Sequence, residues 1–312
     1  MWVQNLSNAE TNGEFKASLR ALFSMPGRGF LQRYQEISLA SVNFMWSLPQ
    51  SLPLAQLEHA IRVRLECICQ VVREYDREGS GVGYGGNVML YVDTTGSRFA
   101  SAVVLAALQE RTVCIETGVA ITNLAGVLDL QLPLSIRSTG SFSPDTNLTA
   151  MALPIPRRPP NESATRRNVD NVIPGAPYAF VSEQALVFCN QHELVNKVAS
   201  NRLFSSVVLH QLSEVVAAQA AHVQALICIP LYGAARPEAG HRAPIGIVNI
   251  HRNQPDPHAT AKFEYLAPLL VPLAQSLGNL VEQLPWTAIL KTIREGQEYE
   301  QYDHHPTQHH EF

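Results

Sequence analysis

The sequence has little charge and no long apolar run. Only 16% of its 312 residues are charged, and 23 Lys and Arg stand against 27 Asp and Glu for a formal net charge of −4. This balance gives no overall attraction for nucleic acid or for an anionic membrane. The apolar tract Ile37–Leu48 is too short to cross a bilayer, and the first residues lack the basic start and apolar block of a signal peptide. We therefore expect a cytoplasmic protein that binds neither nucleic acid nor membrane.

Cysteines are few and scattered. There are five, an odd number, and four of them stand in apolar runs. This pattern argues against a disulfide framework and favours reduced thiols. Cys67 and Cys69 are two positions apart on a predicted helix, so they point to different faces and do not form a metal or redox pair.

The chain also lacks the short motifs that mark common catalytic sites. It contains no G-x-x-x-x-G-K-[ST], no G-x-S-x-G, no H-E-x-x-H and no C-x-x-C. The segment Gly79–Gly86 is rich in glycine, but it follows a predicted helix and precedes a predicted strand. A phosphate cradle needs the opposite order, strand and then helix N-terminus. We expect a flexible turn there, no metal site and no enzymatic activity.

Apolar periodicity predicts the elements of the first half. Phe30–Trp46 and Leu54–Tyr75 repeat apolar residues at steps of three and four, as amphipathic helices do. Asn87–Asp93 is predicted to be a strand, and Arg98–Leu108 is interpreted as its hairpin partner, although the same residues also suit a helix. Two further strands are expected in the apolar runs VCIETGVAI and VLDLQLPLSI of Thr112–Arg137.

The second half opens with a segment of different amino-acid composition. Leu153–Pro177 holds six prolines and four arginines and almost no apolar periodicity, which indicates a long surface loop. Tyr178–Cys189 is predicted to be a strand and Asn190–Ala220 to be helical. A last helix is expected over Lys262–Leu284, bent by the two prolines inside it.

Ala225–Glu282 carries the strongest family signal. Two short apolar strands lie on either side of a polar loop and are followed by a long amphipathic helix. The first strand ends in Cys228-Ile229-Pro230-Leu231, the second is Ile245–Ile250, and the helix begins near Phe263. This order resembles the C-terminal half of a GAF domain.

The N-terminal half supports the same resemblance, because a long helix entering a strand such as NVMLYVD is similar to the start of a GAF domain. The resemblance implies an α+β fold with an antiparallel sheet of about six strands and the two terminal helices packed on one face. It divides the chain into a helical extension at 1–53, a GAF-like domain at 54–284 with a Pro/Arg-rich insertion at 153–177, and a polar, disordered tail at 285–312. It also implies a homodimer through the terminal helices.

The function that the resemblance implies is small-molecule sensing without catalysis, with the signal passed to a partner protein. In GAF domains the segment before the "PL" strand lids the ligand cavity, and Gln191–Ala220 takes that place here. No cofactor is assigned. The positions that the family suggests for the pocket are Tyr91, Val92, Phe188, Leu226 and Cys228. The loop arginines Arg157 and Arg158 are candidates to grip an anionic group if the loop lies over the cavity.

Two other functions stay open. One is a structural, docking subunit of a multiprotein assembly in which the cavity has closed. A sealed, wholly apolar cavity would favour that subunit, and polar groups converging on an open cavity would favour the sensor. The other is a thiol redox enzyme, such as the methionine-sulfoxide reductases of GAF fold, which needs two cysteines within disulfide reach.

Two ligand classes of GAF domains are not expected. Cyclic-nucleotide binding would need an acidic pair where Ala267-Pro268 stands, four residues beyond Phe263. Tetrapyrrole attachment is not expected either, because Cys189 and His192 match no bilin-binding motif.

Overall fold

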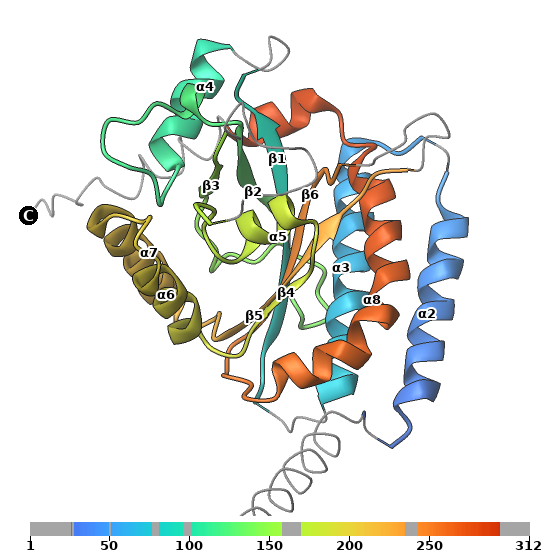
Figure 1. The fold of residues 1–312 in the computed structure, drawn as a ribbon. Coiled ribbons are helices and arrows are strands. Elements are labelled where there is room, and N and C mark those ends of the chain that lie inside the picture. Colours follow the sequence, from blue (N-terminus) through green and yellow to red (C-terminus); the bar gives the residue numbers. More distant parts are fainter. Residues whose placement is uncertain are drawn as a thin grey trace, which may run out of the picture.

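A six-stranded antiparallel sheet runs through the middle of the molecule (Figure 1). The computed structural model describes residues 26, 28–49, 51–76, 81–95, 101–157, 170–234 and 243–293. The strands lie in the order β3-β2-β1-β6-β5-β4. In chain order they are β1 (Tyr84–Asp93), β2 (Gly126–Arg137), β3 (Ala152–Ile155), β4 (Leu186–Phe188), β5 (Ala225–Leu231) and β6 (Gly246–Arg252).

The two central strands, β1 and β6, come from opposite halves of the chain. Each is covered on both faces, so nearly all of their residues are buried. Val88 pairs with Val248 on the face that the long helices cover, and Met89 pairs with Ile247 on the opposite face. Since neighbouring residues of a strand point to opposite faces, this register divides the core into two layers, one on each side of the sheet.

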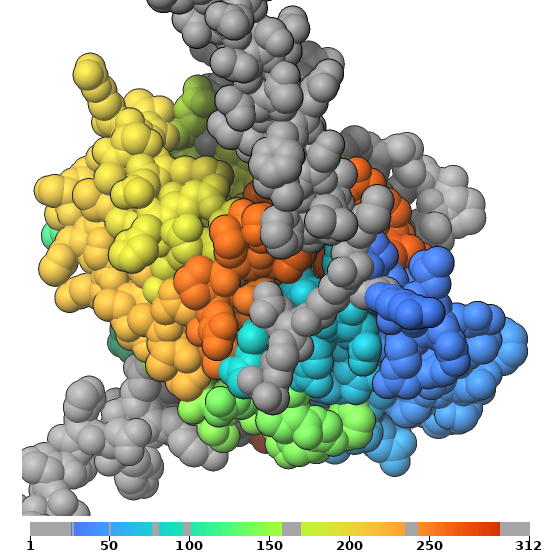
Figure 2. All heavy atoms as spheres, turned by 90° about the horizontal axis from the view of Figure 1, so that it is seen from below, coloured from blue at the N-terminus to red at the C-terminus, as the bar shows by residue number. Residues whose placement is uncertain are grey.

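Three long helices cover one face. α3 (Leu54–Asp76) and α8 (Ala259–Val281) pack together against the sheet, and α2 (Phe30–Ser47) lies alongside α3. Figure 2 shows α2 in blue, α3 in cyan and α8 in orange side by side. The predicted α+β class and the placement of the terminal helices on one face are confirmed.

The sequence predicts that Leu57, Ile61, Leu65 and Ile68 are buried against Leu269, Leu273 and Leu277, and the contact between α3 and α8 contains most of these residues. Buried positions on α3 are Leu57, Ile61, Leu65 and Ile68, and on α8 they are Leu266, Leu270, Leu273 and Leu277. Leu269, which was expected to be fully buried, is half-buried at the edge of the same core.

α8 tolerates its two prolines because of where they lie. Pro268 and Pro272 stand inside the helix and are exposed, so water can reach the carbonyls that lose their helical donor. On the inner side the helix approaches the end of β5 so closely that a Cβ on Gly278 would lie 2.1 Å from the Tyr232 carbonyl oxygen. Glycine is therefore needed at this crossing.

Three shorter helices cover the opposite face: α5 (Ala176–Ser182), α6 (Gln191–Ser200) and α7 (Ser206–Gln219). α4 (Ala102–Arg111) and a short 3₁₀ turn, η1 (Ile121–Asn123), lie at the β3 end of the sheet. Buried Arg111 forms an ion pair there with buried Asp129 of β2. Among the residues described, no helix combines the length and apolarity that crossing a membrane requires.

Three predicted strands need correction. Residues of Arg98–Leu108 form α4 instead of a hairpin partner, because Ser101 caps a helix by accepting a hydrogen bond from the Val104 amide. The run VCIETGVAI is irregular and ends in η1, with one bridge between Thr112 and Ala152. The first five residues of Tyr178–Cys189 belong to α5, and only Leu186–Phe188 near its end form a strand, β4.

The loop expected over Leu153–Pro177 is structured at both ends of its described part. Its first residues form edge strand β3, and Val172 and Ile173 are buried near the start of α5. Residues 158–169 lie outside the described residues. The start of the segment expected to be a disordered tail is ordered, because 286–293 are helical and Ile289 and Ile293 are buried in the helix-side core; residues 294–312 lie outside the described residues.

The α3–sheet contact should be a main source of stability. Leu65 is fully buried against β1 at Gly86. We expect Leu65→Ala to lower the free energy of unfolding by about 2–5 kcal/mol, because it removes buried methyl groups and leaves a cavity. Urea denaturation measures this. The control is Leu31→Ala on α2, where the leucine is 70% exposed and a change within about 0.5 kcal/mol is expected; similar losses in both variants would contradict the described packing.

Candidate functional site

A cavity of about 110 Å³ lies between the sheet and the helices α5, α6 and α7. Its walls are apolar. The sheet contributes Met89, Leu130, Phe188 and Leu226, and the helix side contributes Ile173, Leu194, Leu212 and Val216. No Asp, Glu, Lys or Arg side chain lines it among the described residues.

Three buried polar side chains stand on the sheet side of this cavity: Asn87 of β1 and Asn249 and His251 of β6. They are 7%, 6% and 4% exposed. The Asn249 Nδ2 donates to Asn87 Oδ1 over 2.9 Å, and His251 Nδ1 lies 3.3 Å from the His222 carbonyl oxygen. The Asn249 Oδ1 and His251 Nε2 atoms are buried without a hydrogen-bond partner.

Strand alternation places these three residues together. Asn87 pairs directly with Asn249, and His251 lies two residues further along β6 on the same face. The pairing of β1 with β2 shifts between Asn87 and Met89, so the ladder is irregular beside the polar group.

His251 also needs the glycine that faces it. Gly85 of β1 pairs with His251, and a Cβ on Gly85 would lie 2.5 Å from the imidazole Cε1. The absence of a side chain at Gly85 therefore leaves the space that the imidazole occupies beside β1.

Burial decides the protonation of His251. Removal from water lowers the pKa of the imidazole, and this effect outweighs the hydrogen bond to His222 and the attraction of Asp145, which raise it. A carbonyl oxygen only accepts, so the contact with His222 requires the proton on Nδ1. The neutral ring then keeps a lone pair on Nε2, the atom that is buried without a partner.

The remaining polar lining residues mark the side of the cavity that approaches solvent. Asn190, Gln191, Gln219 and Gln224 are half-buried and come from the start of α6 and the end of α7. The Gln191 Nε2 donates to the Val223 carbonyl. One side-chain amide thus joins the start of α6 to the segment that follows α7, and we call these two helices, which cover the cavity, the lid.

The predicted pocket residues fall into different places. Phe188 and Leu226 line the cavity, and Cys228 is fully buried in the same core layer without lining it. Val92 points to the opposite face, into the core beneath the long helices. The structure thus places two of the five sheet positions at the cavity, while Cys228 and Tyr91 pack in the same core layer without lining it.

Tyr91 and Arg157 line a separate, wider hollow of about 560 Å³. The Tyr91 ring stacks on Phe180 at 4.8 Å, and its hydroxyl donates to the Ala125 carbonyl. The Arg157 guanidinium donates to the carbonyls of Leu124 and Thr122, so it holds the chain locally. Arg158 lies outside the described residues.

The three polar residues on the sheet side were missed at the sequence level. Asn87 and Asn249 interrupt otherwise apolar strands, and that interruption is the signal that could have found them. The polar residues that follow His251 in the sequence predict a surface position for it, but it lies inside β6 and is buried.

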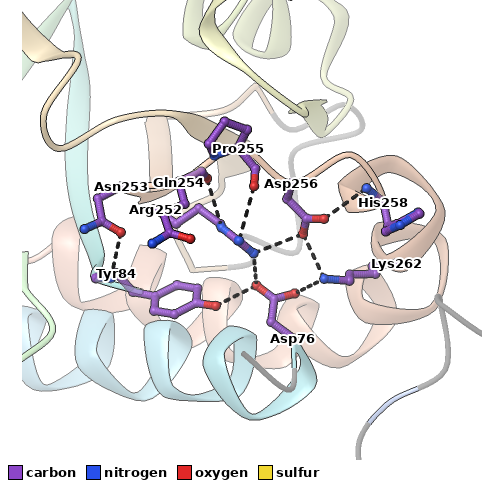
Figure 3. A network of polar contacts seen from close by, with 10 residues as sticks. Asp76, Tyr84, Arg252, Asn253, Gln254, Pro255, Asp256, His258 and Lys262 are labelled. Carbon is purple, nitrogen blue, oxygen red and sulfur yellow. Dashed lines mark hydrogen bonds and ion pairs between the residues drawn. The ribbon is translucent and has the colours of Figure 1, made fainter. Parts of the chain in front are cut away.

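A second polar centre lies at the adjacent end of β6 and joins it to both long helices (Figure 3). The Arg252 Nη1 lies 3.1 Å from Asp76 Oδ2 of α3 and 3.3 Å from Asp256 Oδ2. The Lys262 Nζ of α8 lies 3.1 Å from Asp76 Oδ1 and 2.9 Å from Asp256 Oδ2. The Tyr84 hydroxyl donates to Asp76. We call these side chains the ion network. Its four charged members are 5–9% exposed.

The two cations offset the cost of burying two carboxylates. Burial raises the pKa of Asp76 above its ordinary value, and Lys262 opposes that rise. The carboxylates in turn raise the pKa of Lys262. Arg252 follows His251 directly in β6, so the ion network and the cavity share one strand but lie on its two faces.

Thiol and metal chemistry receive no support from the described residues. All five cysteines are free, and burial raises the pKa of Cys67, Cys69, Cys114 and Cys228, with Cys114 at about 12. Raised values keep the thiols protonated and weakly nucleophilic. No group of three His, Cys, Asp or Glu side chains gathers in the described part of the chain.

Comparisons with protein-family models, with curated proteins and with solved structures found no match. The function must therefore be inferred from the residues of the cavity.

The ion network should be sensitive to its charge balance. Lys262→Met leaves two buried carboxylates to share Arg252, and we expect a loss of about 3–5 kcal/mol in the free energy of unfolding. Adding Asp256→Asn to that variant removes one carboxylate, while the asparagine oxygen can still accept from the His258 amide that Asp256 now bonds. Urea denaturation should show that the double variant is more stable, by about 1 kcal/mol or more, than the sum of the two single losses predicts. Strictly additive losses would show that the charges act independently.

His251 should make stability depend on pH. Its folded-state pKa is lowered, so the unfolded chain takes up a proton near pH 6.5, the model-peptide value, and the folded chain only at lower pH. Above that value the contribution of His251 to the free energy of unfolding is fully present. It is lost as the pH falls further, at a rate of at most about 1.4 kcal/mol per pH unit. We expect His251→Phe to flatten the decrease in unfolding free energy between about pH 7.5 and 5.5. The control is His210→Phe, at an exposed position of α7, which should keep the wild-type slope; an unchanged slope in His251→Phe would contradict the assignment.

Proposed function

We propose that this chain is a non-enzymatic regulatory module of GAF type that binds a small, largely apolar molecule in the cavity beneath α5, α6 and α7. The observation that carries the proposal is the pair of unpartnered buried atoms, Asn249 Oδ1 and His251 Nε2, on the sheet side of an apolar cavity. In this proposal a partner protein reads whether the cavity is occupied.

The energetic argument starts from the cost of those two atoms. A buried polar atom without a partner costs about 1–3 kcal/mol, and most buried polar atoms in folded proteins are bonded. Apolar residues at Asn249 and His251 would extend the apolar walls of the cavity and avoid this cost. Polar atoms at these positions therefore favour a bound molecule, and they favour the sensor over an assembly subunit with a sealed apolar cavity.

The cavity volume limits the size of the ligand. A cavity of about 110 Å³ is somewhat smaller than the apolar cavity of roughly 150 Å³ that holds a benzene-sized molecule. One small ring or a short branched chain is therefore the upper limit of size, and it requires small adjustments of the lining side chains. A larger ligand would require α6 and α7 to move outward.

The arrangement of the lid supports the regulatory part of the proposal. α6 and α7 lie between β4 and β5 in the chain, the place where the GAF resemblance expects a lid. A ligand beneath the lid contacts Leu194 of α6 and Leu212 and Val216 of α7 directly, so occupancy can set the position of both helices.

Filling the cavity should abolish ligand binding. Val216 is half-buried and lines the cavity from α7, so Val216→Phe places a ring inside it. We expect native mass spectrometry of protein purified gently from its own host to show a small-molecule mass that denaturation removes. That mass should be absent from Val216→Phe.

The matched control is Val207→Phe, on an exposed position of the same helix, which should retain the mass. If the wild type carries no small molecule and co-purifies with polypeptides instead, the proposal is wrong and the assembly subunit is favoured. A mass retained by Val216→Phe would place its binding site elsewhere.

A further inference from the structure

We infer that the cavity selects an uncharged ligand that presents an N–H or O–H donor to Asn249 and His251, and that it rejects carboxylates and other anions. This inference rests on the proposed function and adds the chemical class of the ligand. It follows from the hydrogen bonds that the two side chains already make.

Asn249 presents an acceptor. Its Nδ2 donates one of its two hydrogens to Asn87 Oδ1 over 2.9 Å. Its Oδ1 is buried and unpartnered. A ligand that bonds this atom must bring a hydrogen.

His251 presents a second acceptor. Its Nδ1 faces the His222 carbonyl oxygen at 3.3 Å, and a carbonyl cannot donate, so Nδ1 carries the proton. Nε2 then has a free lone pair and is buried without a partner. The lowered pKa keeps the ring neutral, which preserves this lone pair.

The two acceptors lie close enough to act on one small molecule. Asn249 and His251 are separated by one residue on the same face of β6, which puts their backbones about 7 Å apart. A ring with one donor can reach either atom, and a compact molecule with two donors can reach both.

Charge is disfavoured by the rest of the lining. No charged side chain lines the cavity within the described ranges, so an ion would lose its hydration without gaining a counter-charge. An anion would also face two lone pairs. An apolar molecule without a donor would fill the volume but leave both acceptors unpaired, and sites of this kind discriminate strongly against such analogues.

Phenol, toluene and benzoate separate these cases, because they share one ring and differ in the donor and the charge. The test is titration of each probe into the wild-type protein, followed by the chemical shifts of methyl groups that line the cavity. We expect phenol to bind about tenfold or more tightly than toluene, and benzoate not to bind.

Variants tie the preference to the named atom. His251→Phe keeps a ring of similar shape and lacks the acceptor, so the phenol-to-toluene ratio should fall several-fold. His210→Phe, the same change at an exposed position of α7, should keep the wild-type ratio. Circular dichroism confirms that each variant is folded.

Equal binding of phenol and toluene, preferential binding of benzoate, or no binding of phenol would overturn the inference. Its failure can be told from failure of the proposed function. If a co-purifying molecule disappears in Val216→Phe while phenol and toluene bind equally, the cavity is a ligand site without donor selection. If no small molecule is lost from the wild type, the proposed function itself fails.

Discussion

The end of β6 is the point on which the architecture depends. Arg252 reaches into the ion network with Asp76 of α3 and with Asp256 and Lys262 at the start of α8. These charges are buried, so none can leave its partners without a large electrostatic cost. The network therefore fixes which face of β6 meets the helices. By alternation it also fixes that His251 and Asn249 face the cavity.

One face of β6 therefore belongs to the helix-side core, and its other face belongs to the cavity wall. On the helix side, Val248 and Ile250 join a dense apolar core that stabilises the fold. On the other side, Asn249 and His251 occupy positions where apolar residues would pack better, and they leave acceptors unpaired. Local departures from the rules of core packing are expected where a protein binds something, and on β6 the departure lies beside the cavity.

Much of the fold could be predicted from periodicity, but the site could not. The helices Leu54–Asp76 and Ala259–Val281 have long apolar stripes, and a stripe is a local signal that tertiary contacts reinforce. The ten residues of α4 suit either state, and the Ser101 cap decides for a helix.

The partners of the polar residues are distant in sequence. Asn249 bonds an asparagine 162 residues away, and Lys262 bonds a carboxylate 186 residues away. In the sequence alone, an asparagine in a strand suggests only a break in the apolar pattern. A lysine at the start of a helix suggests a charge exposed to solvent. Only the register of β1 against β6 reveals that these side chains are paired and buried.

The uneven packing of the two faces indicates where ligand binding would act. α3 buries eleven residues against the sheet and its neighbouring helices, whereas α6 buries only Leu194 and Val198 and α7 only Val208 and Leu212. Elements with few buried contacts open at lower free energy than those that form a dense core. A ligand that contacts the lid from below adds a larger fraction of contacts to α6 and α7 than it could add to any helix on the opposite face. Binding energy would therefore be expressed as a change in the position or order of the lid, and a partner protein that distinguishes the occupied state would contact α6 and α7.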